Sequence, residues 1–102
     1  MKAETLAALV ATVVPDATVH PTDLTGDGDH WFVVVVSPAF EGQRPLARQR
    51  PILAAFTPHF AAGTVHALDL KCMTPAELAE QGLPEPFWPH GAGEGMHPAA
   101  WD

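Results

Sequence analysis

The fold is decided by residues 25–36, which read TGDGDHWFVVVV. Thr25 to Asp29 form a dense turn signal, because either glycine can take the positive φ that a tight turn requires. The six residues after His30 all favour β-structure and show no polar alternation, so they predict a strand that is central in its sheet or covered on both faces. Before the turn, residues 17–24 contain Pro21, which cannot donate a ladder hydrogen bond and therefore predicts an edge strand. We expect an antiparallel hairpin from these two strands.

Helical patterns lie on both sides of this hairpin. Residues 2–14 carry apolar side chains at the i, i+3, i+4, i+7 spacing of an amphipathic helix, and Pro15 predicts its end near Val14. Pro45 and Pro51 are expected to divide the following segment into a short helical turn over 45–49 and a longer helix from residue 51. The predicted buried face of that longer helix is Ile52, Leu53, Ala55, Phe56 and Phe60.

The last strand and helix have clear local signals. Residues 65–72 alternate, with His66, Leu68, Leu70 and Cys72 on one predicted face. Thr74-Pro75-Ala76-Glu77 places a threonine at the N-cap and a glutamate three residues later, which is the capping-box arrangement, and Gly82 is well placed to end the helix. The sequence thus predicts an α+β domain of order αββαβα, a three-stranded mixed sheet packed with helices.

Length and composition predict one small domain over residues 1–81, followed by a Gly/Pro-rich C-terminal tail over 82–102 that holds His90 and His97. No apolar run approaches the length of a membrane span, so we expect no membrane partner. Cys72 is the only cysteine in the chain, which fits a reducing compartment, and we expect a cytoplasmic location.

Two histidines occupy corresponding positions in the predicted sheet. His30 opens the second strand and His66 opens the third, and these strands should run parallel because a helix joins them. The starts of parallel neighbours lie at the same end of the sheet, about 5 Å apart, so in a close register the two imidazole rings meet at one edge of the domain. Each histidine is in phase with apolar residues of its own strand, His30 with Phe32 and Val34, and His66 with Leu68 and Leu70. A single histidine at a strand start is usually a capped or half-buried polar residue. As a pair, the two predict a metal or proton role, and two ligands are too few for a tetrahedral site, which favours a metal shared with a second molecule.

In this order the residues resemble the BolA family. The similarity covers about residues 2–81, and the Gly-Asp-Gly-x-His turn resembles the IbaG branch in particular. The residues that carry it are Gly26-Asp27-Gly28-Asp29-His30, Ser37, Phe40-Glu41-Gly42, Arg48-Gln49-Arg50, Val65-His66-Ala67-Leu68 and Thr74-Pro75-Ala76-Glu77. The chain departs from the family at Gln49, where many members have histidine, and in its longer tail.

This resemblance implies a fold similar to type II KH domains and a non-enzymatic role in iron–sulfur and redox homeostasis. Family members pair with monothiol glutaredoxins and share a [2Fe–2S] cluster with them. The resemblance assigns His66, from the His-Ala-Leu motif, and His30, from the turn before the second strand, as cluster ligands. Histidine can replace cysteine on one iron of such a cluster.

Nucleic-acid binding is a second hypothesis, since the implied fold is KH-like and some BolA-like proteins act as transcriptional regulators. Three of the five basic residues, Arg44, Arg48 and Arg50, lie within seven positions and could contact phosphates. The formal net charge of −7 argues against this function, and Gly42-Gln43-Arg44-Pro45 lacks the second glycine of a GXXG loop.

An enzyme is a third hypothesis, for which the sequence offers little. Ser37 is the only serine, and no set of nucleophile, base and acid stands out. The acidic residues Asp23, Asp27 and Asp29 do not fit the spacing of a calcium-binding EF-hand loop and are interpreted as a solvated acidic turn.

Overall fold

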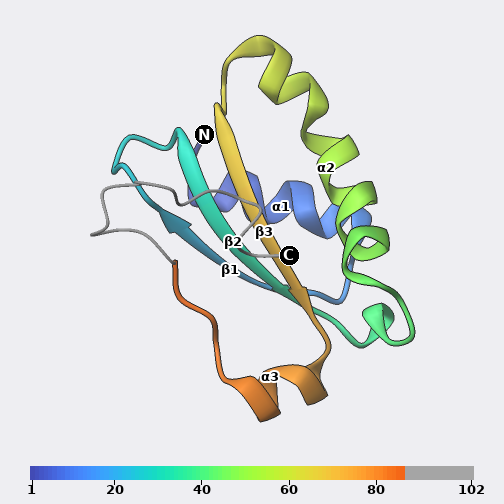
Figure 1. Cartoon of the computed structure of the whole chain (residues 1–102). Coiled ribbons are helices and arrows are strands. Elements are labelled where there is room, and N and C mark those ends of the chain that lie inside the picture. The colour runs from blue at the N-terminus through green and yellow to red at the C-terminus, as the bar shows by residue number, and fades with distance from the viewer. Residues whose placement is uncertain (87–102) are drawn as a thin grey trace.

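The computed structural model describes residues 1–86 as an α+β domain with one mixed sheet (Figure 1). The strand order is β1-β2-β3, with β1 antiparallel and β2 parallel to β3, which confirms the predicted architecture. Along the chain the elements are α1 (Ala3–Val13), β1 (Thr18–Asp23), β2 (His30–Val36), the 3₁₀ turn η1 (Pro38–Phe40), α2 (Pro45–Ala62), β3 (Ala67–Met73) and α3 (Pro75–Gln81).

The middle strand, β2, is buried on both faces, as its unbroken apolar sequence predicts. Residues 31–36 are all buried, and their side chains divide between two apolar clusters. Trp31, Val33 and Val35 pack with residues of α1 and α2, including Leu6 and Phe56. The alternate side chains, Phe32, Val34 and Val36, belong to a second cluster with Met73 of β3 and Leu78 of α3. The period-2 alternation of a strand therefore separates the two faces cleanly.

Each outer strand of the sheet has a device that suits it to an edge. The Leu24 N–H donates to the His30 carbonyl (2.8 Å). Because the backbone groups of an antiparallel strand point alternately toward its partner and away from it, the backbone nitrogen of Pro21 points away from β2. A proline at this position therefore costs the sheet no backbone hydrogen bond between strands. On β3, side chains from α2 bond outward-facing carbonyls: Arg48 donates to Cys72 and Gln49 to Leu70. The proline on β1 and the two bonded carbonyls on β3 thus disfavour further strand pairing at these positions.

The second helix corrects two predictions. It runs unbroken from Pro45 to Ala62, with Pro51 and Pro58 inside it, where we expected a short helical turn over 45–49 and a separate helix from residue 51. A proline removes one helical hydrogen bond, here to the carbonyls of residues 47 and 54. Both prolines and both acceptor residues are exposed, so water can bond those carbonyls. Phe60, predicted to be buried, is 37% exposed, whereas Phe56 is fully buried.

The C-terminal elements begin close to the predicted residues. Strand β3 begins at Ala67, two residues later than expected, although Val65 is buried. Thr74 and Glu77 form the predicted capping box at the start of α3, and Gly82 follows its last residue. Most of the predicted tail, including His90 and His97, lies outside the described residues. Among residues 1–86 no helix combines the length and apolar character that crossing a membrane demands.

Two phenylalanines of α2 provide a matched test of this core. We expect Phe56→Ala to lower the free energy of unfolding by about 3–5 kcal/mol, because it empties a fully buried site. Phe60→Ala removes the same atoms from a half-exposed site and should cost less than about 1 kcal/mol. Urea denaturation followed by circular dichroism measures both. Equal losses in the two variants would contradict this description of the helix.

Candidate functional site

The starts of β2 and β3 lie side by side, which confirms the predicted parallel pairing. His30 is level with Ala67, and the pairing continues to Val36 and Met73. One step earlier, the carbonyl of Asp29 accepts two backbone hydrogen bonds, from the N–H of His66 (3.0 Å) and from the N–H of Ala67 (3.2 Å). The segments that carry the two histidines are therefore tied together at one end of the sheet, which we call the strand-start rim (residues 28–30 and 65–67).

The register places the two histidines diagonally across this rim. Because His30 is level with Ala67, the residue opposite His66 is Asp29. His30 is half-buried and in phase with Phe32, on the face that carries α3. His66 is in phase with Leu68 and therefore with the opposite face, that of α1 and α2. Each histidine is thus in phase with apolar residues of its own strand, as expected, but the one-residue offset between the two strands puts the histidines on different faces of the sheet. Convergence of the two imidazole rings stays a prediction.

The side chain of His66 is held by Asp29. Nδ1 of the imidazole lies 2.5 Å from Oδ1 of the carboxylate, while the histidine side chain is still 67% exposed. Asp29 thus binds His66 through both its backbone carbonyl and its side chain. We did not predict this contact, because we interpreted the acidic turn as solvated. The one feature of the sequence that points to the contact is that Asp29 directly precedes β2 and His66 directly precedes β3, the strand that pairs with β2.

The turn before β2 is organised by another acid that we had interpreted as solvated. The carboxylate of Asp23 accepts the N–H of Gly26 (3.0 Å) and the N–H of Gly28 (2.7 Å). Gly28 has φ +76°, and a Cβ there would lie 2.6 Å from the Met1 carbonyl oxygen, so the position requires glycine. Its carbonyl accepts the indole N–H of Trp31 (2.9 Å). These bonds fix the backbone conformation of the turn that leads into the strand-start rim.

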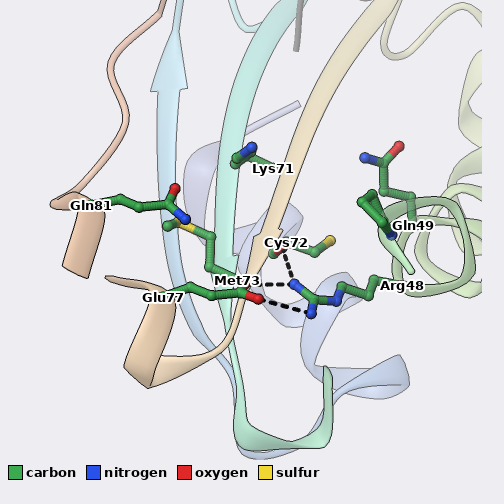
Figure 2. A pocket seen from close by; sticks show the side chains of 8 residues that line it. Arg48, Gln49, Lys71, Cys72, Met73, Glu77 and Gln81 are labelled. Atoms are coloured by element: carbon green, nitrogen blue, oxygen red, sulfur yellow. Dashed lines mark hydrogen bonds and ion pairs between the residues drawn. The ribbon is translucent and has the colours of Figure 1, made fainter. Parts of the chain in front are cut away.

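The three arginines proposed for nucleic acid do not form one surface. Arg44 and Arg50 are exposed, but Arg48 is 8% exposed and turned into the protein. Its guanidinium donates to both carboxylate oxygens of Glu77 (2.7 and 3.1 Å) and to the Cys72 carbonyl (3.0 Å), as Figure 2 shows. Arg48 also lies 5.8 Å from the centre of the Phe40 ring. Its charge is engaged between α2, β3 and α3, at one side of a pocket of about 220 Å³.

The thiol of Cys72 is a poor candidate for metal binding. The residue is buried in the cluster under α1 and α2, and burial raises the pKa of its thiol to about 12. A thiolate is the form that binds metals, and little of it exists near neutral pH. Within residues 1–86 no three His, Cys, Asp or Glu side chains gather as a metal site.

The fold and the rim place this chain in a class of small α+β domains with a mixed three-stranded sheet. Solved structures of that class are similar to it. A BolA protein homologue from Coxiella burnetii aligns with a TM-score of 0.60 at 30% identity, covering 78% of this chain and 97% of its own. BolA1 from Mus musculus aligns with a TM-score of 0.67 at 27% identity, covering 80% and 72%.

Sequence comparison names the family. A family model described as BolA-like protein matches residues 3–77. An Acinetobacter guillouiae protein described as "Uncharacterized protein in rpoN-murA intergenic region" is 34% identical over 83 residues, covering 81% of this chain and 96% of its own. Acid stress protein IbaG of Escherichia coli (strain K12) is 32% identical over 56 residues, covering 55% and 67%. The chain belongs to the BolA-like family.

The ion pair of Arg48 with Glu77 predicts a pH dependence of stability. The guanidinium, and then the Thr74 N–H, lower the pKa of Glu77 from 4.5 to about 2. The stabilisation is therefore complete above pH 4.5 and is lost as the pH falls toward 2. Glu77→Gln keeps the capping box but removes the charge. We expect it to cost about 1 kcal/mol at neutral pH, since Glu77 is partly exposed, and nothing near pH 2.

The matched control is Glu80→Gln, an equal change of charge on an exposed residue of the same helix. Chemical denaturation of the three proteins across the acid range measures the difference. A gap between wild type and Glu77→Gln that stays constant down to pH 2 would contradict the assignment.

Proposed function

We propose that this protein is a non-enzymatic partner of a monothiol glutaredoxin, and that His30 and His66 contribute nitrogen donors to a [2Fe–2S] cluster held jointly by the two proteins. The observation that carries the proposal is the strand-start rim, where two histidine-bearing segments are tied together through the Asp29 carbonyl. Membership of the BolA-like family supports it.

The donor chemistry of the rim fits such a group. Neutral imidazole is the commonest nitrogen ligand for metals in proteins, and His66 presents a largely exposed side chain. A ligating histidine almost always donates its other ring N–H to a carboxylate or carbonyl, and Asp29 supplies a carboxylate at Nδ1. When bound, the cluster would supply one-electron chemistry or serve as cargo, and two histidines on one iron raise its reduction potential relative to cysteine ligation.

Two imidazoles would provide half of the four ligands that a [2Fe–2S] cluster takes. The other ligands in this proposal are thiolates of the glutaredoxin and of glutathione, which soft iron–sulfur clusters accept readily. In a shared site of this kind, two ligands from this chain are enough, because the partner supplies the others. The partner would then lie against the end of the sheet that carries His30 and His66.

The nucleophilic side chains of the domain support a binding role over catalysis. Ser37 is fully buried, where its hydroxyl donates to Asp16 (2.8 Å) and accepts the Ala39 N–H (3.0 Å) at the start of η1. Burial raises the pKa of the Cys72 thiol, which disfavours the reactive thiolate. Both groups therefore have structural surroundings: the Ser37 hydroxyl is buried and engaged in two hydrogen bonds, and the Cys72 thiol stays protonated near neutral pH.

The cluster ligands can be tested by single substitutions. We expect His30→Ala and His66→Ala to keep the fold and to shorten the lifetime of the mixed cluster at least about tenfold, because even outer-sphere partners of a metal site cost about 10–100-fold. The measurement is co-expression with a monothiol glutaredoxin, followed by visible absorption and circular dichroism of the purified complex. The spectral features of histidine ligation, which resemble those of a Rieske centre, should weaken in either variant because one nitrogen donor is lost.

The control variant is His20→Ala, since His20 pairs with Val34 in the middle of β1, away from the rim. It should leave the spectrum and the lifetime of the cluster unchanged. Wild-type spectra and lifetimes in both His30→Ala and His66→Ala would refute the proposed site.

A further inference from the structure

We infer that Asp29 is a positioning residue for His66: its carboxylate holds the proton of the neutral imidazole on Nδ1, so that Nε2 is the donor nitrogen of this side chain. The inference deepens the proposed function, because it names the atom through which His66 would bind the shared cluster. The state of the free ring can nevertheless be measured without any cluster or partner.

The contact that carries this inference is unusually well supported by the backbone. The Asp29 carbonyl accepts the N–H groups of both His66 and Ala67, which brings the two side chains to the same level of the rim. The imidazole Nδ1 then lies 2.5 Å from the carboxylate Oδ1. A side chain that is 67% exposed would otherwise sample several rotamers, and this bond selects one of them.

The chemistry of the two groups determines which nitrogen stays open. A neutral imidazole has one N–H donor and one lone pair, and an ionised carboxylate can only accept. A hydrogen bond from Nδ1 to Asp29 therefore requires the Nδ1–H tautomer and leaves the lone pair on Nε2. The same arrangement of carboxylate, histidine and metal orients ligands in other metal sites and raises the basicity of the ligating nitrogen.

Asp29 can be changed without removing the bonds that join β2 to β3. Those bonds use its backbone carbonyl, which any residue provides. Asp29→Ala deletes the acceptor, whereas Asp29→Asn keeps an oxygen that can accept the same bond. Asp27→Ala is the control for the turn, because the Asp27 carboxylate bonds the Thr25 hydroxyl and the backbone N–H of Asp29 rather than the His66 ring.

The experiment is long-range ¹H–¹⁵N correlation of the His66 ring in the isolated protein, at a pH where the ring is neutral. We expect the Nδ1–H tautomer in wild type and in Asp27→Ala, and a change to a mainly Nε2–H ring in Asp29→Ala, with Asp29→Asn in between. In the glutaredoxin complex, Asp29→Ala should shorten the cluster lifetime by about tenfold, and Asp29→Asn by less.

An Nε2–H ring in the wild type, or a tautomer unchanged in Asp29→Ala, would overturn the inference, whatever the cluster does. A tautomer that changes in Asp29→Ala, together with a cluster unaffected by both His30→Ala and His66→Ala, would support the inference on the free ring and refute the proposed cluster site. Far-ultraviolet circular dichroism of each variant confirms that the domain is folded.

Discussion

The parallel pairing of β2 with β3 is the constraint on which the rest of this molecule depends. Parallel neighbours need a crossover, and α2 provides it, burying Ile52 and Phe56 against the sheet. The pairing makes β2 the central strand, where six consecutive apolar residues are buried on two faces at about 1.5–3 kcal/mol each. It also brings the turn before β2 beside the loop before β3, which creates the strand-start rim.

Arg48 joins the opposite end of the same sheet to both later helices. Its planar guanidinium can bond the two carboxylate oxygens of Glu77 at once while it also reaches the Cys72 carbonyl, a set of contacts that a lysine could not make. Glu77 in turn accepts the Thr74 N–H, so the capping box of α3 is continuous with the ion pair. One buried charge thus aligns α2, β3 and α3.

Local patterns predicted the elements of this fold well, because their signals lie within a few residues. The capping box at Thr74 and the proline of the edge strand are of this kind. The failures concern partners distant in sequence. Arg48 lies 29 residues from Glu77, and Asp29 lies 37 from His66, so both were interpreted as surface charges. Pro51 misled because the carbonyl that it leaves without a helical partner, that of residue 47, is exposed to water, and the helix continues through the proline.

The diagonal placement of the two histidines follows from the core and cannot be adjusted to suit them. A slip of β3 by one residue would bring His66 level with His30, on the same face. Because side chains alternate, that slip would also turn Leu68, Leu70 and Cys72 away from α1 and α2 and disrupt the apolar cluster that they complete. Each lost apolar side chain costs about 1.5–3 kcal/mol, more than a hydrogen bond at the rim returns. A group bound by both rings therefore has to lie beyond the strand ends, where the chain can present donors from either side of the sheet. In that position Asp29, directly opposite His66, is the residue best placed to orient its ring.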